Sequence, residues 1–403
     1  MSDHLLNAVD SYRQDMVEFT KALVAIPTEN PPGTACRQCV ERIGQELDKL
    51  GLGYVIAEVP RSASCKGAEP RFWLSSQFGN GSRTLYFHGH YDVVPASNSN
   101  QFQPYVKGGN LFGRGSSDMK AGLASMTYAV KALKDCVLEL NGKVCLTLVP
   151  DEETGGQQGS AYLASAGLLG QDGIGMLMPE PTSGLVWNAS RGALSLRVTV
   201  RGKPAHVGLH YQGVNAFEGM MAVAAALQDL KTEVESRKTK ENIQPEVARN
   251  SIMLLGGRCE GGTNFNVVPD VCSFTIDRRI NPEEDLLVEK ERLLGVLEKV
   301  RLGGIDLEVE ILQEADSAGV SKDTALGRAL AESIQNVTLK PPTFAMCPGL
   351  LEIRFYARRG VPAFAYGPGL LSVSHGPSEF VKLKDIGRCA AVYALTAAQL
   401  LAT

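Results

Sequence analysis

Histidine and carboxylate side chains that could bind a metal ion occur directly after three short runs of apolar residues. The runs and the polar residues that follow them are 84–87 before His88, His90 and Asp92, 144–149 before Asp151, Glu152 and Glu153, and 175–178 before Glu180. Imidazole nitrogens together with several carboxylate oxygens form a ligand set that suits zinc, manganese or cobalt. These positions therefore predict a metal-dependent site.

The apolar runs predict the elements that would bring these side chains together. Apolar stretches of this length, bounded by turn residues, are typical of strands buried in a parallel sheet. In open α/β sheets, ligands bind beyond the carboxyl ends of the strands, which is where the polar residues fall. Asp118 precedes a helical stretch, residues 119–135, in the position of a helix N-cap. We therefore expect Asp118 to be held near the same edge of the sheet.

Length and composition limit the classes of protein to which the chain can belong. The 403 residues exceed one ordinary hydrophobic core, so we expect two domains. A net charge of −4 gives no indication of nucleic-acid binding, and no stretch is long and apolar enough to cross a membrane. The nine cysteines form no disulfide framework and the first residues do not resemble a signal peptide, which together predict a cytoplasmic protein.

The order of strand and helix patterns predicts how the chain is divided. Strands alternate with helices over most of the sequence, which indicates an α/β fold with a doubly wound, mainly parallel sheet. After residue 191 the order becomes strand, helix, strand, strand, helix, strand, which is the ferredoxin-like pattern. We predict a catalytic domain of residues 1–190 and 313–403, with an α+β domain of residues 191–312 inserted into it.

Five short motifs follow one another between residues 89 and 376. They are GHxDVVP at 89–95, GRGxxDMK at 113–120, DEE at 151–153, EPT at 180–182 and SHG at 374–376. In this order they resemble the M20 family of metallopeptidases and amidohydrolases, which includes acetylornithine deacetylase, succinyl-diaminopimelate desuccinylase, aminoacylase-1 and the glutamate carboxypeptidases. Any one motif alone is a weak signal, whereas five in order are specific. The inserted domain fits the lid and dimerisation domain of that family.

The resemblance implies a site for two divalent metal ions, with zinc expected first and cobalt or manganese as alternatives. Asp92 would orient a histidine ligand, and Glu152 would act as general acid and base toward a hydroxide that bridges the two ions. The implied ligands are His90 and Glu180 for one ion, Glu153 and His375 for the other, and Asp118 as the bridge between them.

Other implied site residues lie in the inserted domain and in the last quarter of the chain. His206, in a G-x-x-A-H segment, would stabilise the oxyanion across a homodimer. Asn266 and Arg279 would bind the carboxylate of the substrate, which a fork of donors suits well. Gly369 belongs to a GPG turn ahead of the last ligand, and it is a further candidate for substrate binding.

Several of these residues also have simpler explanations. His206 could be an exposed side chain and Arg279 a solvated strand arginine. The sequence Leu351–Arg354 departs from the family pattern, which leaves the role of Arg354 in substrate binding open. His88 is better explained as a packed imidazole than as a ligand, and His210 could enter a pocket or face water.

The function that the resemblance implies is hydrolysis of the amide bond of N-acyl amino acids. Glutamate at position 180 and the sequence around it favour the deacetylase and desuccinylase branch. Three alternatives stay open: a carboxypeptidase or dipeptidase on the same scaffold, an enzyme acting on other amides, and a non-catalytic binding protein. The expected partners are a small acyl amino acid or peptide and a second copy of the chain, without nucleic acid or membrane.

Overall fold

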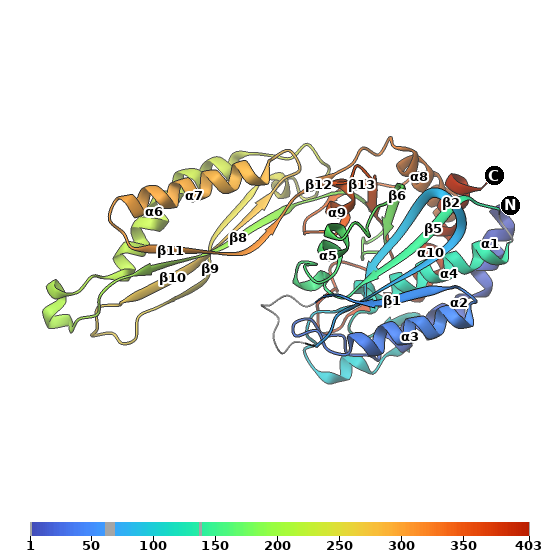
Figure 1. Cartoon of the computed structure of the whole chain (residues 1–403), viewed down its shortest axis with the longest axis horizontal. Helices are drawn as coiled ribbons and strands as arrows, with labels where there is room; N and C mark the ends of the chain where they lie inside the picture. Colours follow the sequence, from blue (N-terminus) through green and yellow to red (C-terminus); the bar gives the residue numbers. More distant parts are fainter. Residues whose placement is uncertain (1, 61–68, 137–138, 403) are drawn as a thin grey trace. The chain divides into compact units, whose positions relative to one another are not determined.

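The computed structural model describes residues 2–60, 69–136 and 139–402, and the chain divides into two compact units (Figure 1). The first unit consists of Met1–Asn188, Val320–Ala345 and Glu352–Thr403. The second consists of Ala189–Gly319 and Met346–Leu351, a late return of the chain that no sequence pattern indicated. Among the described helices, none combines the length and the apolar composition that a membrane crossing needs.

The first unit holds the alternating strands and helices that the sequence pattern indicated. Its α-helices are α1 (Ser2–Ser11), α2 (Arg13–Val24), α3 (Cys36–Lys49), α4 (Ala121–Asp135), α5 (Ser160–Ser165), α8 (Ala325–Thr338), α9 (Ile353–Ala357) and α10 (Leu383–Leu401). The strands of its large sheet are β1 (Tyr54–Glu58), β2 (Phe72–His90), β5 (Asn141–Val149), β6 (Gly173–Met178), β7 (Val186–Ser190), β13 (Phe344–Cys347) and β14 (Ala363–Ala365). A small separate sheet contains β3 (Tyr105–Lys107), β4 (Asn110–Phe112) and β15 (Phe380–Lys382).

The large sheet runs in the order β1-β2-β6-β14-β7-β12, where β12 is the short strand Ala318–Gly319, with β5 paired to β2 and β13 paired to β7. The pairs β2–β6, β14–β6 and the second arm of β2 with β5 are parallel. Along residues 74–78 the partners on β5 run backward from Leu148 to Val144, and along residues 84–90 they run forward from Lys143 to Val149. Strand β2 therefore bends back on itself, and both of its arms pair with β5. The predicted α/β fold with a mainly parallel sheet is confirmed.

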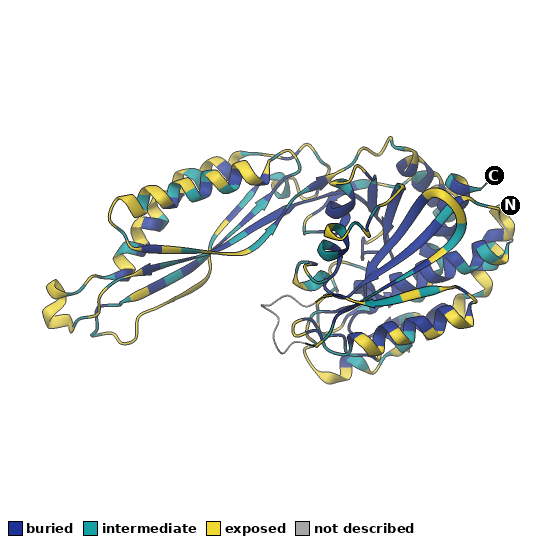
Figure 2. Cartoon of the chain, viewed as in Figure 1, coloured by how far each residue is buried: buried dark blue, intermediate teal, exposed yellow. Residues whose placement is uncertain are grey.

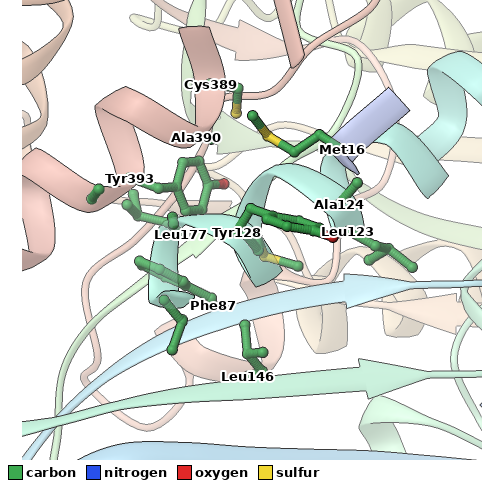
Figure 3. Packing of buried hydrophobic residues seen from close by; sticks show 14 of the residues in the cluster. Met16, Phe87, Leu123, Ala124, Tyr128, Leu146, Leu177, Cys389, Ala390 and Tyr393 are labelled. Carbon is green, nitrogen blue, oxygen red and sulfur yellow. The ribbon is translucent and has the colours of Figure 1, made fainter. Parts of the chain in front are cut away.

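Helices cover both faces of the large sheet. Successive side chains of β2 point to opposite faces, so each face has apolar side chains that a helix must cover. Phe87 packs edge to face on Tyr393 of α10, with ring centroids 4.7 Å apart. Tyr86 points the other way and packs on Tyr356 of α9 at 5.3 Å. Figure 3 shows the buried cluster on the Phe87 side of the sheet, in which Leu123 and Tyr128 of α4 lie together with Phe87 and Tyr393.

The second unit has the ferredoxin-like arrangement. Its strands β8 (Gly192–Arg201), β9 (Ile252–Gly261), β10 (Val271–Ile280) and β11 (Leu307–Ala315) form an antiparallel sheet in the order β11-β8-β10-β9. Figure 1 shows α6 (Ala216–Ser236) and α7 (Leu286–Leu302) side by side on one face of this sheet. Their outer faces are exposed, as Figure 2 shows, while Leu227 and Leu293 contribute to the buried core. The short strand β12 ends the segment Ala189–Gly319 of this unit and pairs with Ala189 and Ser190 of β7.

The prediction that Asp118 is the N-cap of a helix is wrong. Helix α4 begins at Ala121, and its N-cap is Lys120. Asp118 lies in a kinked turn, Ser116–Lys120, and has extended backbone angles of φ −122° and ψ 96°. The backbone N–H of Asp118 donates to the carboxylate of Glu379 at 3.0 Å, a contact 261 residues away along the chain. A long-range hydrogen bond, and not a local cap, therefore sets the conformation of Asp118.

Candidate metal centre

The candidate site forms where the loops after three strands of the large sheet meet. His90 is the last residue of β2, and Tyr91 donates its N–H to the carbonyl of Val149 at the end of β5. Glu152 and Glu153 lie in the turn that follows β5, and Glu180 comes two residues after the end of β6. The parallel pairing of β2 with β5 and β6 thus brings the predicted clusters to one edge of the sheet.

Two groups of three donors share the carboxylate of Asp118. His90 Nε2 lies 3.3 Å from Asp118 Oδ1 and 3.7 Å from Glu180 Oε1. On the other side, His375 Nε2 lies 3.4 Å from Asp118 Oδ2 and 3.3 Å from Glu153 Oε2. Within each group the ligand atoms all lie within 4.8 Å of one another. One carboxylate oxygen therefore faces each group, as a bridging ligand requires.

The buried donor atoms do not satisfy one another by hydrogen bonds, and a divalent cation would. Three of their buried atoms make no hydrogen bond to the described residues: His90 Nε2, Glu153 Oε1 and Glu180 Oε1. A buried polar atom without a partner costs about 1–3 kcal/mol, and more when the group is charged. Burial raises the pKa of Glu180 well above its ordinary value, and the nearby charge of Asp118 raises it further. A cation would satisfy these atoms and stabilise the carboxylates in their charged form.

The two imidazoles respond to the same carboxylates. Hydrogen bonds with Asp118 and Glu153 raise the pKa of His375 to about 10. Burial opposes protonation of His90, yet the carboxylates of Asp118 and Asp92 raise its pKa well above the ordinary value. Because metal ligation needs neutral imidazole, cation binding should release the protons that these histidines hold.

Asp92 supports the site in two ways. Its carbonyl oxygen lies 3.0 Å from His90 Nδ1 and its Oδ1 lies 3.4 Å from the same nitrogen, which leaves Nε2 facing the donors. Its carboxylate also accepts the backbone N–H groups of Glu152 and Glu153 at 3.2 and 3.1 Å. The expected orienting residue therefore also holds the turn that carries both glutamates.

Glu152 is placed beside both groups without belonging to either. Its carboxylate makes no hydrogen bond or ion pair with the described residues. Burial raises the pKa of Glu152 well above its ordinary value against the opposing charge of His90, with a further contribution from Glu153. A carboxyl group whose pKa moves toward neutrality can both accept and return a proton.

The remaining predicted residues of the first unit border this centre. Arg354 is buried on α9 and donates from Nη2 to the carbonyl of Gly155, just after the DEE turn, at 2.9 Å. His88 is fully buried and contacts Glu352 at 2.8 Å, Ser160 at 3.0 Å and Tyr356 at 3.1 Å. It therefore packs inside the first unit, as the simpler explanation of this histidine predicted.

Gly369 packs against the turn that carries Asp118. It has φ +112°, and a Cβ at this position would collide with Ser117 Oγ. The structure therefore explains the glycine by close packing next to a candidate ligand. Whether it also contacts a substrate stays a prediction.

Replacing Gly369 by alanine should lower the free energy of unfolding by about 1–3 kcal/mol, because the new methyl group forces Ser117 to move. Gly184→Ala is the matched control, since Gly184 also has a positive φ (+83°) but nothing within 4 Å of its Cβ position. Urea unfolding of both variants measures the difference. Equal losses in the two variants would show that backbone conformation alone requires glycine at position 369.

The second unit carries the other predicted residues. His206 and His210 are exposed in the turn around Val207–Gln212, and Val207 donates its N–H to the carbonyl of Asn266 at 3.0 Å. This unit therefore brings the loops of His206 and Asn266 together.

Arg279 is not part of that arrangement. Strand β10 begins at Val271, shortly after Asn266, and Arg279 lies near its other end. The distance from Val271 to Arg279 is roughly 26 Å along an extended strand. The side chain of Arg279 pairs with Asp277, with Nε 2.8 Å from Oδ1. Within one chain, Arg279 and Asn266 do not form a single fork.

Buried polar residues that the sequence pattern did not single out hold the loops of the site. Asn30 donates from Nδ2 to Asp92 at 2.8 Å and to Asp151 at 3.0 Å, and Arg71 donates to Asn30 Oδ1 at 3.0 Å. Glu379 accepts from the turn that carries Asp118. The one signal available for Asn30 was its place in the loop before two prolines, since these contacts join segments far apart in sequence.

Comparison with known proteins agrees with this geometry. The model of peptidase family M20/M25/M40 matches residues 86–399. The chain belongs to this family. The match includes every candidate ligand, from His90 to His375.

Relatives and solved structures of the M20 family extend the match to nearly the whole chain. A probable succinyl-diaminopimelate desuccinylase of Staphylococcus epidermidis is 27% identical over 93% of this chain and 94% of its own length. The M20 metallo-carboxypeptidase Sso-CP2 of Sulfolobus solfataricus has a TM-score of 0.76, 17% identity and coverage of 95% and 98%. YxeP of Bacillus subtilis, described as a dinuclear metal-binding peptidase, has a TM-score of 0.70, 15% identity and coverage of 97% and 99%. The protein is thus a metal-dependent amidohydrolase of the M20 family.

Proposed function

We propose that this M20 enzyme hydrolyses the amide bond of N-acyl amino acids, releasing a carboxylic acid and a free amino acid. The observation that carries the proposal is the pair of donor groups that share Asp118, with the carboxylate of Glu152 unengaged beside them. The desuccinylase relative supports this substrate class. Glutamate at position 180, which in the family accompanies deacylases and carboxypeptidases, agrees with it.

His90, Asp118 and Glu180 would hold one cation, and Asp118, Glu153 and His375 the other. Two cations in such a centre polarise an amide carbonyl and lower the pKa of a water molecule toward about 7. Imidazole and carboxylate donors suit zinc, and they also accept cobalt or manganese. We propose zinc as the native ion.

Glu152 would move the protons of the reaction. Its carboxylate would accept a proton from the attacking water and return it to the nitrogen of the departing amino acid. The backbone N–H of Glu152, held by Asp92, keeps this carboxylate beside the donors while leaving its oxygens free. The same carboxyl group can serve in both steps. Taking the proton from water leaves Glu152 protonated, as the donation to nitrogen requires, and that donation restores the carboxylate.

His206 would donate a hydrogen bond to the oxyanion that develops on the amide carbonyl. Its Nδ1 accepts the N–H of Gly208 at 3.1 Å, so the neutral ring carries its proton on Nε2. The side chain is exposed and presents this N–H outward. We propose that residues 191–312 form a lid and dimerisation domain, that residues 1–190 and 313–403 form the catalytic domain, and that His206 acts across a homodimer.

His206→Ala should lower kcat by about 10²–10³-fold, the range for removing one oxyanion donor, without changing the metal content. His210→Ala is the matched control, because His210 is an exposed histidine of the same turn. Steady-state kinetics and metal analysis of both variants check the prediction. Loss of metal from His206→Ala would contradict the proposed role.

Because Asn266 and Arg279 lie apart within one chain, we propose that the carboxylate of the amino acid is bound by Arg279 of one chain and Asn266 of the second copy, with Arg354 and Gly369 bordering the pocket. For Arg279 this requires that its guanidinium be shared with Asp277. The second candidate function is a metallo-carboxypeptidase or dipeptidase, which the similarity to Sso-CP2 favours. Both functions hydrolyse an amide next to a carboxylate, so a similar set of donors would serve them. We further propose that the enzyme acts in the cytoplasm.

Release of free amine from a panel of substrates tests the proposal. The panel holds N-acetyl, N-succinyl, N-formyl and longer N-acyl amino acids together with dipeptides, each assayed with added Zn²⁺, Co²⁺ or Mn²⁺. Chelator-sensitive cleavage of acyl amino acids is the expected result. Cleavage of the dipeptides alone would favour the peptidase, and no cleavage with metal bound would contradict both candidates.

A further inference from the structure

Glu379 lies outside both donor groups but contacts the turn that carries their shared member. It is buried, and its Oε1 accepts the backbone N–H groups of Ser117 and Asp118 at 2.9 and 3.0 Å. These two hydrogen bonds hold Asp118 in the extended backbone conformation that aims its carboxylate at both groups. Hydrogen bonds to a charged acceptor are stronger than those between neutral groups.

The other oxygen of Glu379 connects this turn to the loop of His375. Glu379 Oε2 accepts a hydrogen bond from Arg114 Nη1 at 2.6 Å, and Arg114 is also buried. The same guanidinium donates from Nη2 to the carbonyl of His375 at 3.1 Å and from Nη1 to the carbonyl of Gly376 at 3.2 Å. One buried ion pair therefore fixes two loops that each supply a candidate ligand.

The two donor groups depend on this ion pair to different degrees. His90 is fully buried at the end of a strand, and the pairing of β2 with β5 fixes its backbone. The side chain of His375 is 51% exposed, and its backbone has φ +63°, a region that side-chain-bearing residues seldom occupy. Such a conformation persists only when the surrounding contacts determine it. The carbonyl contact from Arg114 supplies one of them.

Stability alone does not account for a buried Arg114–Glu379 pair. The desolvation of two charges offsets most of their attraction, so well-packed apolar residues often replace such a pair without loss of stability. The pair does what apolar residues cannot do, because it accepts two backbone N–H groups and donates to two backbone carbonyls in a fixed geometry. Residues that orient ligands in this way tune metal affinity.

We propose that Glu379, together with Arg114, is a positioning residue for the group of Asp118, Glu153 and His375, and that it sets how tightly this group binds its cation. The inference rests on the proposed two-cation centre. Because the group of His90 and Glu180 shares only Asp118 with these contacts, its cation affinity should depend on Glu379 much less.

Calorimetric titration of the metal-free full-length protein with Mn²⁺ tests the inference. Mn²⁺ is the weakest binder among the first-row divalent ions, which keeps both steps measurable. The wild type should bind two ions per chain, and we assign the weaker second step to the group of Asp118, Glu153 and His375, because the side chain of its histidine is half-exposed. Glu379→Ala should weaken the second step by roughly 10–100-fold, the usual cost of losing a group that orients a ligand, and change the first step much less.

Two further variants separate positioning from general loss of structure. Glu379→Gln keeps an oxygen for the N–H groups of Ser117 and Asp118, so its second step should weaken less than that of Glu379→Ala. Glu46→Ala is the matched control, because Glu46 is also a buried carboxylate paired with an arginine, Arg42 at 2.8 Å, but on α3. It should lower thermal stability and leave both binding steps unchanged.

If Glu379→Ala does not fold, Arg114→Lys takes its place, since lysine keeps the charge that pairs with Glu379 but lacks the planar fork that also donates to the carbonyls of His375 and Gly376. A weaker second step in this variant supports the inference. Wild-type affinity for both ions in every folded variant would overturn it, as would an equal loss in Glu46→Ala. Failure of the wild type to bind two ions would instead contradict the proposed centre.

Discussion

Glu152→Ala is expected to lower kcat by about 10²–10⁴-fold, the usual contribution of a general acid and base, while the variant keeps its fold and its metal. The carboxylate of Glu152 belongs to neither donor group, so its removal leaves every candidate ligand in place. The backbone contact from Glu152 N–H to Asp92 also survives the substitution, so the turn that carries Glu153 is retained.

Three measurements on the Glu152 variants are needed. Steady-state kinetics on the best substrate of the panel gives the loss of turnover, metal analysis gives the ion content, and circular dichroism reports the fold. Glu152→Gln is the isosteric control, because it keeps the shape of the side chain but cannot take up the proton. Full activity in either variant would refute the assigned role, and loss of metal would show that Glu152 is itself a ligand.

Removal of the metal ions should abolish turnover and lower thermal stability. Without cations, the buried carboxylates of Asp118, Glu153 and Glu180 face one another with unsatisfied atoms among them. A ligand that binds only the folded state stabilises it by about 2.7 kcal/mol per site at 100 times its dissociation constant. The unfolding midpoint should therefore fall after chelation and rise again when Zn²⁺, Co²⁺ or Mn²⁺ is added.

Activity and thermal unfolding are measured on the same samples before chelation, after chelation and after each ion is restored. Calcium is a useful control, because it prefers sites built only from oxygen donors, whereas each group here includes an imidazole. Equal activity and equal unfolding midpoints before and after chelation would contradict a metal-dependent enzyme. Recovery with one ion alone would identify the metal that this centre uses best.

The sequence determined the parts of this protein that depend on local patterns. Apolar runs at 84–87, 144–149 and 175–178 lie within strands of a mainly parallel sheet, and the polar residues after them lie at one edge. The strand and helix order after residue 191 predicted the ferredoxin-like unit. Burial imposes these patterns directly, because a strand inside a parallel sheet must be apolar on both faces and must end where polar residues begin.

The sequence also selected the candidate ligands, through five motifs in family order, and in the structure the donor atoms of these five residues lie in two groups that share Asp118. Their individual roles stay predictions. Outside the motifs, Glu379 carried no local signal and Asn30 only its place before two prolines, although both are buried and hydrogen bonded in the centre. Periodicity reports which face of an element is buried, but it does not report which distant loop an isolated polar residue will meet.

Only the tertiary structure decided how the ligands are aimed. Asp118 is not a helix cap, because Glu379 holds its backbone in an extended turn. Asp92 both orients His90 and holds the DEE turn, and within one chain Arg279 lies apart from Asn266. Each of these results depends on hydrogen bonds or strand positions between residues far apart in the chain. Such contacts form only once the whole sheet is assembled, which is why local sequence patterns do not contain them.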